Sequence, residues 1–173
     1  VFLRDRGNEA VFAPFCFGDG SAAACPCGNS GAARHGCQNS AGTGGALLSG
    51  TGSPSLSSDT VVLTSTGELP TATSILLQGP AQISPVLYGD GLRCTGGSLK
   101  RLFTHGALGG AVSFPGNLDP SISARSAALG APIPVAATRN YQVYYRDPNA
   151  GFCPAPTGST FNISNAVAIF WGS

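Results

Sequence analysis

Short runs of alternating apolar and polar residues dominate the chain after residue 58, and this period of two predicts β-strands. Such runs, rich in β-branched and aromatic residues, lie at 60–66, 73–79, 83–88, 98–105, 110–115, 139–147 and 161–171. The last run is the clearest, because its apolar residues alternate from Phe161 to Trp171 with one break, at Asn165. A helical stripe of apolar residues is missing, although 123–131 could form one helical turn.

Seven or eight short strands separated by turn residues are typical of a sandwich or jelly roll. We therefore expect an all-β fold, a jelly-roll-like antiparallel β-sandwich with a disulfide-linked N-terminal loop region. The alternation in 139–147 places Tyr141 and Tyr145 on one face of a strand and Tyr144 on the other. Trp171 continues the apolar face of the last strand, so Tyr144 is the ring that we expect to be exposed.

The chain of 173 residues has the size of one domain, and its pattern divides it into a linking segment and a domain. Residues 1–15 form a distinct opening segment, and residues 16–173 are expected to form a single β-sandwich. Within the domain, residues 16–58 are rich in Cys, Gly, Ser and Ala with little periodicity, which indicates a cross-linked loop region, and residues 59–173 carry the main strands.

Charged residues make up only 10% of the chain, and the net charge is +1. Without a basic stripe, the sequence lacks the electrostatic footprint of a nucleic-acid-binding protein. A surface with few charges is poorly protected against self-association, so either neighbouring copies cover it or glycans on its many Ser and Thr residues do. No apolar run reaches 18 residues, so we expect no membrane span.

The six cysteines indicate disulfides formed in an oxidising compartment, and hence an exported, extracellular protein. Cys25 and Cys27 are too close to pair easily with each other, so we expect each to pair with Cys16 or Cys37, which leaves Cys94 with Cys153. Six cysteines allow 15 connectivities, and the sequence leaves the choice open. A zinc site that also used His35 is the alternative, but Cys25 and Cys27 are closer together than zinc ligand pairs usually are. The chain also lacks Met and a signal peptide, which a processed, mature chain explains.

Candidate catalytic residues are few. The two histidines, His35 and His105, lie in a loop and at a strand end, and no G-x-S-x-G motif is present. Most acidic residues occupy turns, among them Asp19 and Asp90 in Gly-Asp-Gly, where Asp usually bonds to its own backbone rather than to calcium. We therefore expect a protein that is not an enzyme, with no catalytic, metal or cofactor residues. A secreted carbohydrate-binding module that uses Tyr144 is the first alternative, and a secreted hydrolase that uses His35 or His105 is the second.

Two further features concern partners. Asn162-Ile163-Ser164 is a formal N-glycosylation sequence at the start of a predicted strand. The opening segment carries two apolar patches, which contain Val1, Phe2 and Leu3, and then Val11 and Phe12. Such a segment could add a strand to a sheet of a neighbouring copy, and these five residues are the expected assembly anchors. Docking on its own molecule and a disordered tail are the competing interpretations.

Several motifs in order together resemble a family of exported bacterial domains of unassigned function: FCFGDGS (15–21), ACPCGNSG (24–31), GCQNSAGTGGALLSG (36–50), GDGLRCTGG (89–97), YQVYYRDP (141–148), FC (152–153) and FNISNAVAIFW (161–171). The chain is also similar to protomers of environmental bacterial fibrils. In those fibrils a jelly-roll-like domain is joined to the next through an N-terminal strand. The resemblance implies a structural subunit of an extracellular helical fibril that polymerises with itself, without a cofactor.

Overall fold

The computed structural model describes residues 11–173, and most of their regular structure is β-strand. Ser121 caps the one helix in these residues, α2 (Ile122–Ala128), where its hydroxyl accepts a hydrogen bond from the Ala124 N–H at 3.3 Å. The strands are, in chain order, β1 (Phe12–Phe15), β2 (Leu47–Thr51), β3 (Val62–Thr66), β4 (Thr73–Gly79), β5 (Ala81–Tyr88), β6 (Gly91–Gly96), β7 (Lys100–Gly106), β8 (Val112–Phe114), β9 (Ala137–Arg146), β10 (Phe161–Ile163) and β11 (Ala166–Trp171).

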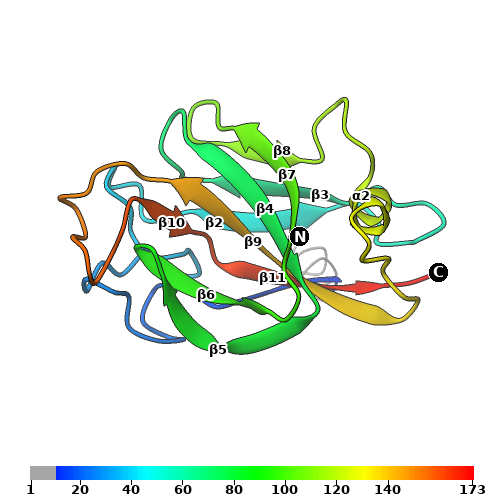
Figure 1. Ribbon diagram of the computed structural model, residues 1–173, viewed down its shortest axis with the longest axis horizontal. Helices are drawn as coiled ribbons and strands as arrows, with labels where there is room; N and C mark the ends of the chain where they lie inside the picture. The colour runs from blue at the N-terminus through cyan, green and yellow to red at the C-terminus, as the bar shows by residue number, and fades with distance from the viewer. Residues whose placement is uncertain (1–10) are drawn as a thin grey trace, which may run out of the picture.

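The strands form two packed sheets and a separate hairpin. The larger sheet has the order β1-β11-β9-β4-β7, with β10 also on β9, and the smaller has the order β2-β3-β8. In Figure 1, β3 and β8 lie in the upper part of the view and the β5–β6 hairpin in the lower part, with β9 and β11 between them. Every named strand pair is antiparallel, so the predicted all-β antiparallel sandwich is confirmed.

The core lies between the two sheets and is built from the alternate residues that the period of two predicts. Tyr141, Tyr145 and Trp171 are fully buried there. Their polar atoms find partners, as buried polar groups must. The Tyr141 hydroxyl donates to Gln78 Oε1 at 2.9 Å and accepts from Trp171 Nε1–H at 3.2 Å. Burial also raises the pKa of both tyrosines, so they remain neutral donors at any physiological pH.

The run at 161–171, expected as one strand, is divided into β10 and β11 by Ser164 and Asn165. Asn165 is fully buried, and its Oδ1 accepts the Leu48 N–H at 2.7 Å while its Nδ2 donates to the Leu48 carbonyl at 3.1 Å. A side-chain amide can replace a backbone neighbour in this way because it carries both a donor and an acceptor. The break in the apolar face is therefore the point where the larger sheet holds the edge of the smaller one.

Two strands lie where the pattern indicated loops, because glycine and serine dilute their alternation. β2 falls inside the Cys- and Gly-rich region, and β6 follows the second Gly-Asp-Gly turn. The β5–β6 hairpin covers part of the outer face of the larger sheet, where Gln142 is fully buried. Gln142 Oε1 accepts the backbone N–H groups of Cys94 and Thr95 at 2.9 and 3.0 Å, so one amide side chain fixes β6 on β9.

Candidate functional site

All six cysteines form disulfides, which are Cys16–Cys94, Cys25–Cys37 and Cys27–Cys153. Cys25 pairs with one of its two expected partners, but the expectation for Cys27 and the expected bridge between Cys94 and Cys153 are wrong. Cys94 lies on β6, a strand that the pattern missed. The fold brings β6 to the start of the domain and the loop before β10 to Cys27. A zinc site is ruled out for these thiols, since none is free.

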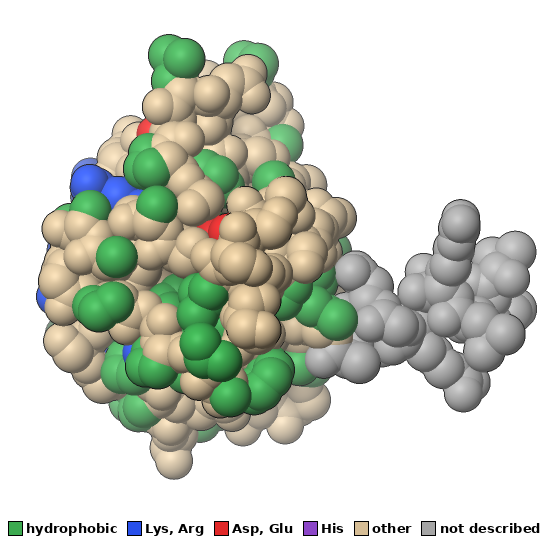
Figure 2. Space-filling model, turned by 90° about the vertical axis from the view of Figure 1, so that its right-hand side faces the viewer, with side chains coloured by type: hydrophobic (Ala, Val, Ile, Leu, Met, Phe, Trp, Pro, Cys, Tyr) green, Lys and Arg blue, Asp and Glu red, His purple; other side chains and the backbone are tan. Residues whose placement is uncertain are grey.

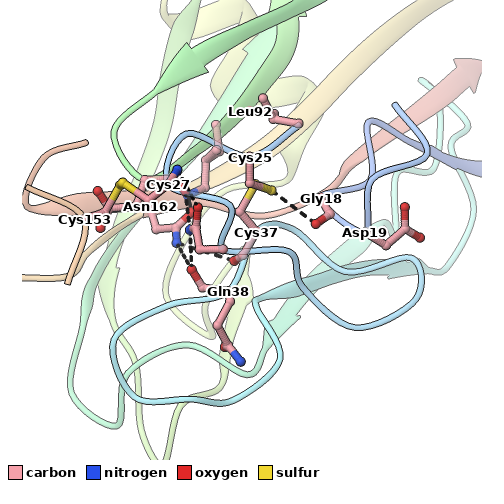
Figure 3. The surroundings of a disulfide bond; sticks show 12 residues. Gly18, Asp19, Cys25, Cys27, Cys37, Gln38, Leu92, Cys153 and Asn162 are labelled. Carbon is pink, nitrogen blue, oxygen red and sulfur yellow. Dashed lines mark hydrogen bonds between the residues drawn. A yellow bond between two sulfur atoms is a disulfide. The ribbon is translucent and has the colours of Figure 1, made fainter. Parts of the chain in front are cut away.

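Asparagine side chains join the disulfide-linked loop to the rest of the domain, and Figure 3 shows one of them, Asn162, beside Cys27 and Cys153. Asn29 Nδ2 donates to the carbonyls of Gln38 and Asp90, both at 2.8 Å, and Asn162 Nδ2 donates to the Gln38 carbonyl at 3.1 Å. Gly36 allows the close approach, because a Cβ there would lie 2.5 Å from the Ile163 carbonyl oxygen. Three disulfides are typical of a protein that folds in an oxidising compartment.

The predicted assembly residues divide into two groups. Val1, Phe2 and Leu3 lie outside the described residues. Phe12 is buried in the core of its own molecule, and Val11 packs against the same core. The end of the expected linking segment therefore belongs to the domain as β1, whose residues pair with β11 from Phe12↔Ile169 to Phe15↔Ala166.

An apolar groove of about 270 Å³ lies between β1 and β2. β1 ends the larger sheet and β2 ends the smaller one, so the groove follows the seam where the edges of the two layers meet. Its lining includes Phe12, Pro14, Leu47, Leu48 and Val167. The groove therefore lies beside β1, the strand that follows residues 1–10 in the sequence.

The two histidines have different surroundings. His35 lies in the disulfide-linked loop, where its Nδ1 is 2.7 Å from the Gly45 carbonyl oxygen. His105 Nε2 is 2.5 Å from Asp119 Oδ2, which also accepts the Gly116 N–H at 2.8 Å. Desolvation raises the pKa of Asp119, but the bonds from Gly116 and His105 and the nearby positive charges outweigh it and lower the pKa. Within residues 11–173, no hydroxyl forms a hydrogen bond with the other ring nitrogen of His105.

The two Gly-Asp-Gly turns hold their carboxylates differently. Asp19 accepts the Arg34 N–H at 2.8 Å and the Ser21 N–H at 3.0 Å, and these bonds lower its pKa to about 2. Asp90 is fully buried and accepts the Ser159 N–H at 2.7 Å, and its desolvation raises its pKa. Both carboxylates therefore serve turn and loop geometry. No group of three His, Cys, Asp or Glu residues suited to a metal ion occurs among the described residues.

Tyr144 lies on the opposite face from Tyr141 and Tyr145, as the alternation predicts, and it is half-buried. Its ring centroid is 5.0 Å from that of Phe161 and 6.4 Å from that of Tyr88. These three rings, with Ile75, Leu77 and Arg101, line a cavity of about 250 Å³, which we call the aromatic pocket. The sequence pointed to Tyr144 alone, because Tyr88 and Phe161 come from β5 and β10 and no local pattern connects them.

A second cavity, of about 390 Å³, shares Arg101 with the aromatic pocket and is lined mainly by polar residues. We call it the arginine pocket, and its lining includes Arg101, His105, Asp119 and Arg125. Arg125 comes from α2 and is held on β7, because its Nε–H donates to the Leu102 carbonyl at 2.8 Å. Arg101 joins the two pockets across β7, so an apolar surface and a cationic surface adjoin each other.

The N-glycosylation sequence at Asn162 is not presented by the folded domain. Asn162 is fully buried, and besides its bond to Gln38 its Oδ1 accepts the Ile163 N–H at 2.8 Å. A glycan at this position would require the loss of both contacts and the opening of the disulfide-linked loop.

Comparisons with known proteins found no similar family, protein or structure: no protein-family model matches the chain, and neither the curated proteins nor the solved structures contain a significant match. Among the described residues, no helix has the length and apolar character needed to cross a membrane.

Proposed function

We propose that this protein is a structural subunit of an extracellular helical fibril, in which residues 1–10 of one copy dock on the next copy. The observation that carries the proposal is the apolar groove between β1 and β2. It lies beside the strand that residues 1–10 lead into, and those residues begin with Val1-Phe2-Leu3. A surface used in this way joins different patches of two copies, so the contact continues into a filament unless it closes into a ring.

Burial of apolar side chains would stabilise the docked segment more than backbone hydrogen bonds between strands would. Pro14 lines the groove and has no N–H, and Asn165 already binds both backbone groups of Leu48. Three apolar side chains in the groove would gain about 1.5–3 kcal/mol each on full burial. We therefore assign Val1, Phe2 and Leu3 as the anchors, with the polar residues 4–9 as the connection between copies.

The remaining surface supports self-association. Figure 2 shows the face near α2 and the C-terminus, on which few charged side chains are visible among hydrophobic and uncharged groups. Large apolar side chains also remain exposed in the described residues, among them Leu108, Leu118, Val135 and Phe170. Such a surface protects a monomer poorly against self-association, whereas a polymer buries part of it between its subunits.

The proposal is tested by deleting residues 1–10 and keeping Phe12, which the domain needs for its own core. We expect folded monomers with intact disulfides by size-exclusion chromatography and circular dichroism, and no filaments by negative-stain microscopy. Replacing Val1, Phe2 and Leu3 with serine should have the same effect, whereas replacing Asp5 and Glu9 with serine should leave filaments. Filaments formed by the deletion variant, or full-length protein that remains monomeric at high concentration, contradict the proposal.

Docking between copies is distinguished from docking on the same copy by crosslinking. A photoreactive phenylalanine analogue replaces Phe2 in isotopically light protein, which is then assembled with heavy protein. We expect crosslinked peptides that join light position 2 to heavy Leu47 or Val167. Crosslinks confined to light chains mean that the segment docks on its own molecule, and the polymer proposal then fails.

A further inference from the structure

The aromatic pocket is lined by aliphatic and aromatic side chains on the outer face of the larger sheet. Ile75 and Leu77 on β4 and Tyr144 on β9 line it from the sheet, and Tyr88 and Phe161 complete the lining, with ring centroids 6.4 and 5.0 Å from that of Tyr144. The β5–β6 hairpin covers this face at Gln142 but leaves the region around Tyr144 half-buried. The pocket therefore offers ring faces to a ligand that has an apolar surface of its own.

Three polar groups of the pocket lining have no partner in the described residues. The hydroxyls of Tyr88 and Tyr144 and the guanidinium of Arg101 form no hydrogen bond or ion pair among residues 11–173. Arg93 does not line the pocket: its guanidinium lies 5.4 Å from the ring centroid of Tyr88, and its Nη1 donates to the Thr95 carbonyl at 2.7 Å. A planar guanidinium presents paired donors that match the two oxygens of a carboxylate.

The arginine pocket extends the cationic surface across β7. Arg125 and His105 line it together with Arg101, and its one carboxylate, Asp119, is already bound to His105 and Gly116. The chain has only nine Lys and Arg residues, and two of the arginines, Arg101 and Arg125, line these two cavities. Two guanidinium groups at adjoining cavities, in a chain with so few charges, favour an anionic ligand.

We propose that the aromatic pocket and the arginine pocket together bind an acidic polysaccharide, a polymer of uronic-acid sugars. A pyranose ring has a face of C–H groups that packs on an aromatic ring, and a uronic acid adds a carboxylate beside that face. Tyr144, Tyr88 and Phe161 contact the sugar ring, and Arg101 binds its carboxylate. The cavities hold about 250 and 390 Å³, which together lie within the range of about 300–1,000 Å³ of small-ligand sites. The neighbouring sugar then lies against Arg125 and His105.

The test uses the full chain and isothermal titration calorimetry with a hexamer of galacturonic acid. Its carboxyl-reduced form, a hexamer of galactose units, and a hexamer of glutamic acid serve as comparison ligands. We expect binding of the acidic sugar that weakens as salt rises, with affinities at least about tenfold lower for the neutral sugar and for the peptide, because only the uronate combines both contacts. Failure to bind the acidic hexamer at millimolar concentration, or equal binding of either comparison ligand, overturns the proposal.

Substitutions test the aromatic part and the cationic part of the site separately. Tyr144→Ala and Arg101→Gln should each weaken binding at least about tenfold, through loss of the ring face and of the charged bond. Arg101 is exposed, so its replacement leaves the core intact even if Tyr144→Ala reduces stability. Phe170→Ala removes an exposed ring from β11, and Arg139→Gln a charge from β9, and both should bind like the original protein. Equal loss in these controls, or unchanged binding in Tyr144→Ala and Arg101→Gln, refutes the assignment. The result is independent of filament formation, which the N-terminal variants test.

Discussion

Removing the bridge between Cys27 and Cys153 should destabilise the domain more than removing the bridge between Cys25 and Cys37. The first pair is 126 residues apart in sequence and the second only 12. In the chain-entropy relation, a closed loop of the first length contributes about 5 kcal/mol at 25 °C and one of the second length about 3 kcal/mol. Because the other bridges remain closed and shorten the longer loop, we expect a difference of about 1–2 kcal/mol between the two double-alanine variants.

Packing predicts the opposite order, so the comparison separates the two effects. Cys25 and Cys37 are both buried, whereas Cys27 is exposed and only Cys153 of its pair is buried. Alanine at 25 and 37 therefore leaves more empty volume in the interior than alanine at 27 and 153.

Urea denaturation of Cys27→Ala/Cys153→Ala and of Cys25→Ala/Cys37→Ala gives the two free energies of unfolding. Digestion without reduction should also yield a peptide pair joined through Cys27 and Cys153. A greater loss in the Cys25/Cys37 variant would show that packing outweighs loop entropy. A peptide pair joined through Cys94 and Cys153 would refute the connectivity itself.

Two buried polar side chains give further predictions. Glu68 is buried, and desolvation raises its pKa above the ordinary value of 4.5, so its contribution to stability is greatest below the unfolded-state pKa and is lost as the pH rises through the folded-state pKa. Glu68→Gln should therefore be more stable than the original protein at pH 7 and lose this advantage near pH 4, as thermal melts over this pH range measure; an unchanged advantage at pH 4 would contradict the titration. Asn165→Ala leaves both backbone groups of Leu48 without their partner and should lower the free energy of unfolding by about 2–4 kcal/mol. Urea denaturation measures this loss, and a loss well below about 1 kcal/mol would mean that these bonds contribute little.

Local pattern predicted most of the strands and the side of the sheet on which their residues lie. The run 73–79 became β4 without a change of bounds, and 139–147 became β9 with a shift at each end. Tyr141 and Tyr145 point into the core and Tyr144 away from it, as the alternation required. The even number of cysteines in a chain with a turn-rich opening region predicted disulfides, and all six are paired.

Other features depended on partners far away in sequence. The strands β2 and β6 carry weak alternation, and they are ordered by Asn165 and Gln142 from the end of the chain. The pairing of Cys27 with Cys153 followed from where the loops lie in space, which the spacing of cysteines does not encode. The aromatic pocket likewise takes Tyr88, Tyr144 and Phe161 from three strands.

By itself, the sequence determined that this chain builds β-strands, which residues face the core and that its thiols are oxidised. These properties follow from the alternation of side chains along an extended backbone and from residue chemistry, which act over a few positions. The tertiary structure alone decided which strands are neighbours, which cysteines meet, where the edge groove lies and how rings and arginines gather on one face. Those outcomes depend on how the whole chain folds, because the contacts that produce them join segments far apart in the sequence.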